Sequence, residues 1–181
     1  DHIIKDAVTI GEAAFIRCDG LSTVEFGTSL TKLDKDAFMD CQSLTKATFK
    51  SDDVKFGIGV FRNCINLTDV SLPVNSTRIG DYMFYNCEDL ETFTIGDSVK
   101  EIGYRAFMNC FKLSITLNNL NWLSSNTSTF DETEEITFTL ETVNGLNEEF
   151  ADYYYKVVET IEDEEPEVEE PEGNEGNENN E

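Results

Sequence analysis

The chain repeats every 23 residues, and this period constrains its fold more than any other feature of the sequence. Apolar residues recur at this spacing in five columns, without an insertion between the repeats. One 23-residue coil has no closed core, but coils stacked at strand spacing would align each column into a continuous buried row. The sequence therefore predicts a repeat solenoid. The columns are Phe15, Phe38, Phe61, Phe84 and Phe107; Cys18, Cys41, Cys64, Cys87 and Cys110; Leu21, Leu44, Leu67, Leu90 and Leu113; Ile10, Leu33, Phe56, Ile79 and Ile102; and Phe26, Phe49, Leu72 and Ile95.

Each unit combines two shorter periodicities. In the first unit, apolar residues from Ala14 to Leu21 follow steps of three and four, which predicts a short helical or 3₁₀ turn. Val24 and Phe26 then alternate with polar residues, which predicts a short strand. We therefore expect an α/β repeat solenoid, with short strands along one face and short helical turns opposite.

A glycine column precedes the turn segment of most units. Gly11, Gly57, Gly80 and Gly103 share this column, and the second unit has Asp34 there. Glycine adopts positive φ freely, and Asp is among the few other residues that tolerate it. We therefore expect a corner with positive φ at this position.

The repeat predicts five coils over residues 1–117. Ile3 falls in the last strand column of a preceding coil, so we expect that further coils precede Asp1. In the fifth coil, Ile115 and Leu117 fall one residue early, which indicates a deletion before the strand.

A degenerate sixth repeat and a C-terminal cap are expected over residues 118–158. Phe130 lies 23 residues after Phe107, and three more apolar residues follow the fifth strand at the same spacing. Residues 150–161 combine helical and strand features, and either structure would cover the last apolar face of the stack. The three apolar residues are Ile136, Phe138 and Leu140.

Acidic residues are concentrated at the C-terminal end. The sequence has 37 Asp and Glu against 13 Lys and Arg, a formal net charge of -24, and residues 159–181 contribute 12 carboxylates and no base. We expect 159–181 to be a disordered tail, because it has too little apolar surface to offset its ordering entropy. Such a tail could act as a charged spacer, attract a basic partner or bind calcium weakly.

Charge and composition also narrow the expected partners and chemistry. Phosphate binding depends on Lys and Arg, so we expect no nucleic-acid partner. No run of 18 apolar residues is present, so we expect no direct membrane insertion. The single histidine, His2, argues against a His-based triad or a multi-His metal site, and we expect no cofactor and no metal. The pattern favours no particular oligomeric state.

The cysteine column allows three interpretations, namely disulfides, metal binding or packing. Neighbouring coils place successive Cys residues within bridging distance, but stacked side chains point the same way and do not reach disulfide geometry. Thiolate metal sites need convergent ligands, which a linear row does not supply. We therefore expect buried packing, since Cys is a small and often fully buried residue.

The polar residues that alternate with the buried strand positions are the candidate binding site. They would face outward from the strand face, the expected concave surface on which solenoids bind partners. Thr is also a good strand residue in its own right, so the same row is compatible with simple solvent exposure. The row consists of Thr23, Glu25, Lys46, Thr48, Asp69, Ser71, Thr92 and Thr94.

Two further surface features accompany this row. Aromatic and basic residues gather on the turn side of the later units, which indicates either a second contact surface or partial burial under neighbouring coils. Three glycosylation sequons begin at Asn66, Asn75 and Asn126, and they matter only in a secreted eukaryotic chain. The turn-side residues are Arg62, Tyr82, Tyr85, Tyr104, Arg105 and Met108.

The units resemble the BspA-type leucine-rich repeat, whose pattern is close to I-G-x-x-A-F-x-x-C-x-x-L-x-x-I-x-I-P. Residues 79–95 and 67–73 are the closest matches, and the resemblance extends strongly to about residue 117 and weakly to 141. It implies a right-handed leucine-rich-repeat solenoid without catalytic residues. It also implies an adhesion or host-protein-binding module of a cell-surface or secreted protein, with a protein or glycoprotein ligand. The alternative is an intracellular, cytoplasmic scaffold or regulatory module whose acidic tail engages a basic partner.

Overall fold

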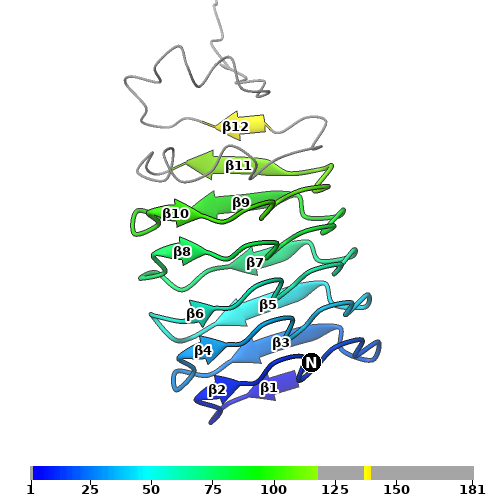
Figure 1. The fold of residues 1–181 in the computed structure, drawn as a ribbon, viewed down its shortest axis with the longest axis vertical. Helices are drawn as coiled ribbons and strands as arrows, with labels where there is room; N and C mark the ends of the chain where they lie inside the picture. Colours follow the sequence, from blue (N-terminus) through cyan, green and yellow to red (C-terminus); the bar gives the residue numbers. More distant parts are fainter. Residues whose placement is uncertain (1, 118–136, 140–181) are drawn as a thin grey trace, which may run out of the picture.

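A computed structural model describes residues 2–117 and 137–139, and shows a β-solenoid of about five coils (Figure 1). All strand pairings are parallel, and each coil contributes one short and one longer strand. The short strands are β2 (Thr9–Ile10), β4 (Lys32–Leu33), β6 (Lys55–Phe56), β8 (Arg78–Ile79) and β10 (Glu101–Ile102). The longer strands are β1 (His2–Ile4), β3 (Thr23–Phe26), β5 (Lys46–Phe49), β7 (Asp69–Ser71), β9 (Thr92–Ile95), β11 (Ser114–Leu117) and β12 (Thr137–Thr139).

The predicted solenoid with its 23-residue period is confirmed. Thr23 pairs with Lys46, and Lys46 with Asp69, so the register advances by one repeat from strand to strand. We number the units from the short strand to the end of the longer strand that follows it. Units 1 to 5 are residues 9–26, 32–49, 55–71, 78–95 and 101–117.

The expected helical turns are wrong, because the described residues contain no helix. In the first turn segment, the N–H groups of Ala13, Phe15 and Arg17 donate to carbonyls of the next coil at 2.8 to 3.0 Å. The N–H groups between them bond within the coil, to the carbonyl three residues back, at 3.2 to 3.3 Å. In a helix, the N–H groups would instead all donate to carbonyls of the same coil. The segment is therefore a series of tight turns that joins neighbouring coils, and the fold is a β-solenoid.

Left-handed residues explain why these turns do not become helical. Ala13 and Arg17 have φ of 53° and 55°, and each such residue interrupts a right-handed helical path. The corresponding positions of later units also have positive φ, including Asn63, Asn86 and Asn109 at 57° to 61°. Apolar steps of three and four therefore arise here from successive turns that return side chains to the core.

The glycine column has a different cause from the one expected. None of its four glycines has positive φ, whereas Gly59 does, at 63°. A Cβ at Gly57 would lie 2.6 Å from the backbone N of Lys35, and one at Gly80 would lie 2.6 Å from the carbonyl oxygen of Gly57. The glycines at 57 and 80 are therefore required by the close approach of neighbouring coils.

The core is a stack of aligned side chains, as the columns predict. The five phenylalanines of the first column stack with ring centroids 4.9 to 5.8 Å apart and ring planes within 24° of parallel. Phe38, Phe61, Phe84 and Phe107 have no exposed surface. Each coil thus uses its neighbours to complete its core.

The predicted packing of the cysteines is confirmed. Cys41, Cys64, Cys87 and Cys110 are free thiols with no exposed surface, and Cys18 at the end of the stack is half-buried. Each buried Sγ donates to the carbonyl of the phenylalanine 26 residues earlier, at 2.9 to 3.2 Å. Burial raises the pKa of Cys41 to about 11 and those of Cys64 and Cys87 well above their usual value.

An asparagine ladder, which the sequence analysis did not identify, runs beside the cysteines. The side-chain amide of Asn63 donates to Asp40 at 2.7 Å, that of Asn86 to Asn63 at 2.9 Å, and that of Asn109 to Asn86 at 2.7 Å. These residues also tolerate the positive φ of their position. The sequence does contain a signal for this ladder, because Asp40 and the three asparagines immediately precede four of the cysteines at 23-residue spacing.

At the first end of the stack the predicted position of Ile3 is wrong, and at the other end the predicted shift of the fifth coil is confirmed. Ile4 rather than Ile3 pairs with Phe26, because the link from β1 to β2 is one residue shorter than that from β3 to β4. Ile3 therefore faces outward and is 56% exposed. At the other end, Ile115 pairs with Phe93, which confirms the one-residue shift in the fifth coil.

Beyond the fifth coil the structure describes only β12, in which Phe138 pairs with Ile115. This is the 23-residue register expected for a sixth repeat. The other positions of that repeat, the cap within 118–158 and the acidic tail 159–181 lie outside the described residues.

Both rows of strands are interrupted at the same boundary, between units 3 and 4, which we call the seam. The longer strands form one sheet from β1 to β7 and another from β9 to β12, and the short strands separate between β6 and β8. β7 ends after three residues, where most other longer strands have four, and Pro73 follows it. The N–H groups of Gly27 and Lys50, at the equivalent position, donate to the preceding coil, so the bond that Pro73 cannot make lies between units 2 and 3 and not at the seam.

The turn side is continuous across the seam. Gly59 and Phe61 donate backbone hydrogen bonds to Asp81 and Met83 of the next coil at 2.9 and 3.0 Å. The rings of Phe61 and Phe84 stack across the boundary at 5.8 Å. Turn bonds and core therefore hold units 3 and 4 together where the strand ladders do not.

Replacing Asn86 tests the asparagine ladder. Asn86→Ala removes two hydrogen bonds and leaves a Cβ at positive φ, so we expect the free energy of unfolding to fall by about 3 kcal/mol. Asn86→Gly loses the same bonds but accepts the backbone conformation, so its loss should be smaller by about 1 kcal/mol. Urea unfolding measures both. A larger loss for the glycine variant would contradict the role of backbone conformation.

Thiol labelling tests the cysteine column. In native protein at pH 8, we expect iodoacetamide to modify Cys18 first, because burial keeps the reagent from the other thiols and their raised pKa keeps them protonated. Peptide mass spectrometry locates the label, and protein unfolded in urea should be labelled at all five cysteines. Labelling of Cys87 as fast as Cys18 in native protein would be incompatible with this core.

Candidate functional site

All eight predicted site residues lie on the outward side of the longer strands. Their neighbours within the strands, such as Val24, Ala47 and Phe93, are buried, whereas the eight are half-buried or exposed. Strand pairing aligns them across coils, in one row from Thr23 to Lys46 and Asp69 and another from Glu25 to Thr48 and Ser71. We call this surface the strand face.

The strand face continues into the fifth coil through two residues that the sequence analysis missed. Thr92 pairs with Ser114, and Thr94 pairs with Thr116. Both residues are half-buried. The one-residue shift hides them from a search at a strict 23-residue spacing, although the alternation around Ile115 would have revealed them.

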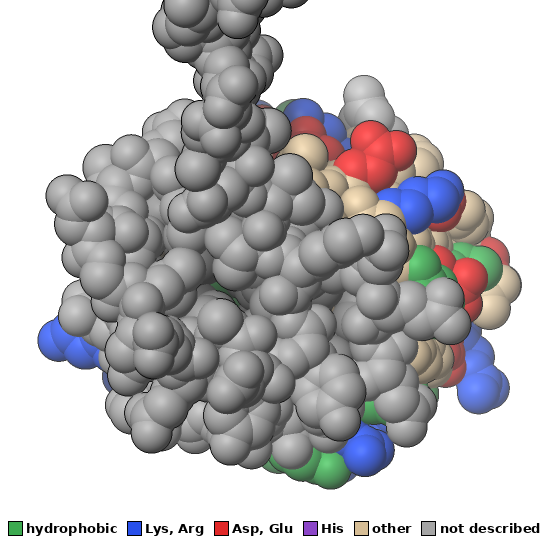
Figure 2. Space-filling model, turned by 90° about the horizontal axis from the view of Figure 1, so that it is seen from above, with side chains coloured by type: hydrophobic (Ala, Val, Ile, Leu, Met, Phe, Trp, Pro, Cys, Tyr) green, Lys and Arg blue, Asp and Glu red, His purple; other side chains and the backbone are tan. Residues whose placement is uncertain are grey.

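The charged members of the strand face are paired with one another or with near neighbours. Lys46 forms an ion pair with Asp69, and Lys50 contacts Glu25 at 2.6 Å. Similar pairs occur elsewhere on the stack, and acidic and basic side chains are interspersed on the described part of the surface in Figure 2. Hydroxyl groups thus dominate the chemistry that this face offers to a ligand.

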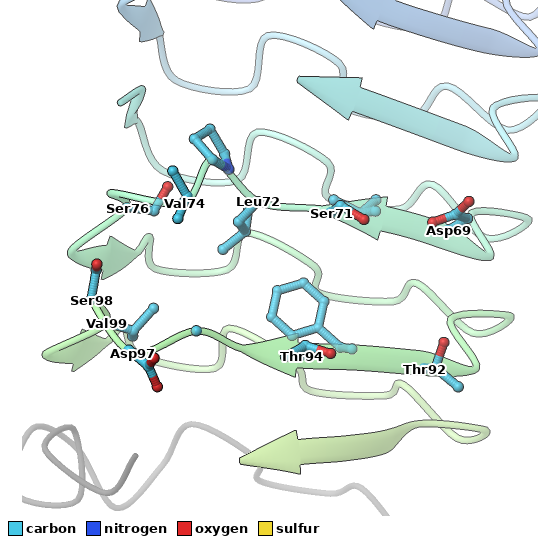
Figure 3. A pocket seen from close by; sticks show the side chains of 14 residues that line it. Asp69, Ser71, Leu72, Val74, Ser76, Thr92, Thr94, Asp97, Ser98 and Val99 are labelled. Atoms are coloured by element: carbon cyan, nitrogen blue, oxygen red, sulfur yellow. The ribbon is translucent and has the colours of Figure 1, made fainter. Parts of the chain in front are cut away.

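A groove of about 510 Å³ opens where the seam crosses the strand face (Figure 3). We call it the seam groove. It is lined by β7 and β9 and by the loops that follow them, up to Ser76 and Val99. Four predicted site residues line it, namely Asp69, Ser71, Thr92 and Thr94, whereas the other four lie elsewhere on the face.

Ser76 is the unusual member of the groove lining. Its repeat position is apolar in two other units, where Leu30 and Val99 are buried. Ser76 is only 2% exposed, and its Oγ has no hydrogen-bond partner among the described residues. An unsatisfied buried hydroxyl is rare and costs stability, so it calls for a specific explanation.

The aromatic and basic residues of the turn side form a compact cluster across units 3 to 5. The Arg62 guanidinium lies 5.1 Å from the Tyr85 ring centroid, and that of Arg105 lies 5.0 Å from the Tyr104 ring centroid. Tyr82 contacts both other tyrosine rings. These five side chains are half-buried, and a contact surface there stays a prediction.

The described residues contain no group of three or more His, Cys, Asp or Glu that could hold a metal ion. Within the same part of the chain, no helix is long and apolar enough to cross a membrane. Asn66 and Asn75, the first residues of two sequons, are exposed, and Asn126 lies outside the described residues.

Comparison with known proteins gives the family. The family model of the BspA type leucine-rich repeat region (6 copies) matches residues 2–114. The chain belongs to the BspA-type leucine-rich repeat family. No catalytic family is indicated, and the repeat is typically non-catalytic. A search of curated proteins finds no match.

Two solved structures are similar to this BspA-type chain. The leucine-rich repeat protein of T. pallidum is 29% identical with a TM-score of 0.58, over 61% of this chain and 52% of that protein. A leucine-rich cell surface protein of Faecalibacterium prausnitzii A2-165 is 26% identical with a TM-score of 0.54, over 76% of this chain and 38% of that protein. The chain therefore spans about half or less of these proteins.

Substitutions on the strand face should leave the BspA-type fold stable. We expect Lys46→Ala to change the free energy of unfolding by less than about 1 kcal/mol, because its ion pair with Asp69 is exposed to solvent. Val70→Ala, at the buried neighbour of Asp69, should cost about 2 kcal/mol. Thermal and urea unfolding compare the two. An equal loss would mean that the face contributes to stability as much as the core.

Proposed function

We propose that this chain is a non-catalytic binding or adhesion module of a surface or secreted protein, and that it binds a protein or glycoprotein through the strand face. The observation that carries the proposal is the alignment of outward polar residues, in register, over neighbouring coils. Repeat proteins bind partners through such extended surfaces by many individually weak contacts. The concave curvature expected of this surface is part of the same proposal.

The cell-surface location is supported by one of the similar structures. The Faecalibacterium prausnitzii protein is a leucine-rich cell surface protein, and it shares the repeat with this chain. The excess of carboxylates makes a protein or glycoprotein a better partner than nucleic acid. Labelling intact source cells with a membrane-impermeant reagent checks the location, and we expect this protein to be tagged.

The second candidate function is a cytoplasmic scaffold that engages a basic partner through its acidic tail. The observation in its favour is the run of 12 carboxylates without a base in residues 159–181. Attraction between such a tail and a basic partner is electrostatic and long-ranged, so it weakens steeply as salt screens the charges.

Truncation and a face variant separate the two functions. Binding to a panel of immobilised secreted glycoproteins should survive removal of 159–181 and change little between 0.05 and 0.5 M salt, on the order of twofold. The double substitution Thr23→Arg and Thr48→Arg should weaken it about tenfold or more, because two large side chains obstruct the face outside the seam groove. If binding is lost on removal of the tail and at high salt, but is unchanged in the Thr23 and Thr48 double variant, the result would support the scaffold instead.

A further inference from the structure

We propose that the seam is a hinge, at which the strand face of units 3 and 4 opens and closes while the turn side acts as the pivot. The inference goes beyond the proposed function, because it describes a motion of the chain itself and needs no partner. In a repeat stack each coil contacts only its neighbours. One boundary with weaker contacts on one side is therefore enough to let the stack bend at that place.

Strand pairing distinguishes the seam from the boundaries next to it. Among the described strands, β5 pairs with β7 and β9 pairs with β11, whereas no pairing joins β7 to β9 or β6 to β8. Ladder hydrogen bonds hold paired strands about 4.8 Å apart. At the seam, the distance between β7 and β9 is set instead by contacts at other points of the two coils.

Two backbone hydrogen bonds flank the groove and define the axis of the motion. At the end of the turn segment, the N–H of Asp89 donates to the carbonyl of Ile65 at 3.0 Å. At the end of the loop that follows β9, the N–H of Lys100 donates to the carbonyl of Thr77 at 2.9 Å. Because β7 and β9 lie between these bonds along the two coils, a bend about them separates the strands without breaking any strand pairing.

Side chains behind the groove are packed less completely than others in their column. Val70 on β7 and Phe93 on β9 are 5% and 3% exposed, whereas Ala47 and Ile115 on the strands beyond them have no exposed surface. The groove of about 510 Å³ already separates the two strands and the loops that follow them (Figure 3). Side chains that border a void have lost contacts on that side, so further opening loses less packing here than at a closed boundary.

The buried Ser76 makes the closed form less stable. Its Oγ has no hydrogen-bond partner among the described residues, and it stands where Leu30 and Val99 are apolar core residues. An unsatisfied buried hydroxyl destabilises the state that contains it. Because Ser76 lines the groove, opening admits water to this hydroxyl, and the open form gains a hydrogen bond that the closed form lacks.

Dipolar EPR between paired nitroxide labels on the full chain tests the hinge. Thr48→Cys with Thr116→Cys places the labels three coils apart across the seam, and Ile3→Cys with Ser71→Cys places them three coils apart where every boundary is paired. In a regular stack both pairs are about 14 Å apart at the backbone. All variants carry Cys18→Ser, which leaves only native thiols without exposed surface.

The expected result differs between the two sides of the stack. The distance distribution of the Thr48 and Thr116 pair should be at least about twice as broad as that of the control pair. Lys35→Cys with Tyr104→Cys also spans three coils across the seam, but on the turn side. Because this side is the pivot, its distribution should be as narrow as that of the control. Equal breadth for all three pairs, or a turn-side pair as broad as the strand-face pair, would overturn the hinge.

Thiol labelling gives a second measurement that needs no spin label. Val70→Cys and Val24→Cys make the same change in one column, the first at the seam and the second between two paired strands. In native protein carrying Cys18→Ser, we expect iodoacetamide to label the Val70 variant about tenfold faster. This rate should also rise with urea below the unfolding transition, because opening exposes apolar surface.

The outcomes of these experiments are separate from those of the proposed function. Equal labelling rates for the two variants would contradict the hinge, and so would a rate for the Val70 variant that urea leaves unchanged, since that rate would report static access through the groove. None of the measurements includes a ligand. A rigid seam would therefore leave the proposed function standing, and a failure of glycoprotein binding would leave the hinge standing.

Discussion

The hydrogen bonds between neighbouring turn segments are the constraint on which the rest of this solenoid depends. Residues with positive φ, such as Ala13 and Arg17, keep each turn segment from closing into a helix, so alternate N–H groups bond to the next coil. The same bonds fix the distance between coils, which stacks the phenylalanine rings and places each cysteine thiol against a carbonyl. Each coil is stable only with its neighbours, because every one of these interactions crosses a coil boundary.

This arrangement lets one side of the stack open without separating the coils. At the seam the turn bonds, the Asn63 to Asn86 contact and the phenylalanine stack continue, while both strand ladders are interrupted. At this boundary β7 is one residue shorter than β9, and Ser76 stands where Leu30 and Val99 are apolar core residues. The seam groove lies at that place.

The sequence predicted the stacking and the outward row, because both follow directly from the period and from alternation. It did not predict the path of the turns, since steps of three and four are common to helices and to successive tight turns. The glycine at 57 was explained wrongly because close approach by Lys35 depends on the spacing of coils. Ile3 was misplaced by a one-residue change in a link, and the seam was not found because it follows from strand pairing that no single column reports.

Stability and the proposed binding surface therefore lie on different sides of the same coil. The core columns and the turn bonds tolerate little change, whereas the outward strand residues contact solvent and each other through exposed pairs that contribute little to folding. Because a repeat unit interacts only with its neighbours, the cost of a buried hydroxyl at Ser76 stays local to units 3 and 4. A boundary without strand pairing in the interior of the stack is thus a position where a groove can form while the coils on either side remain intact.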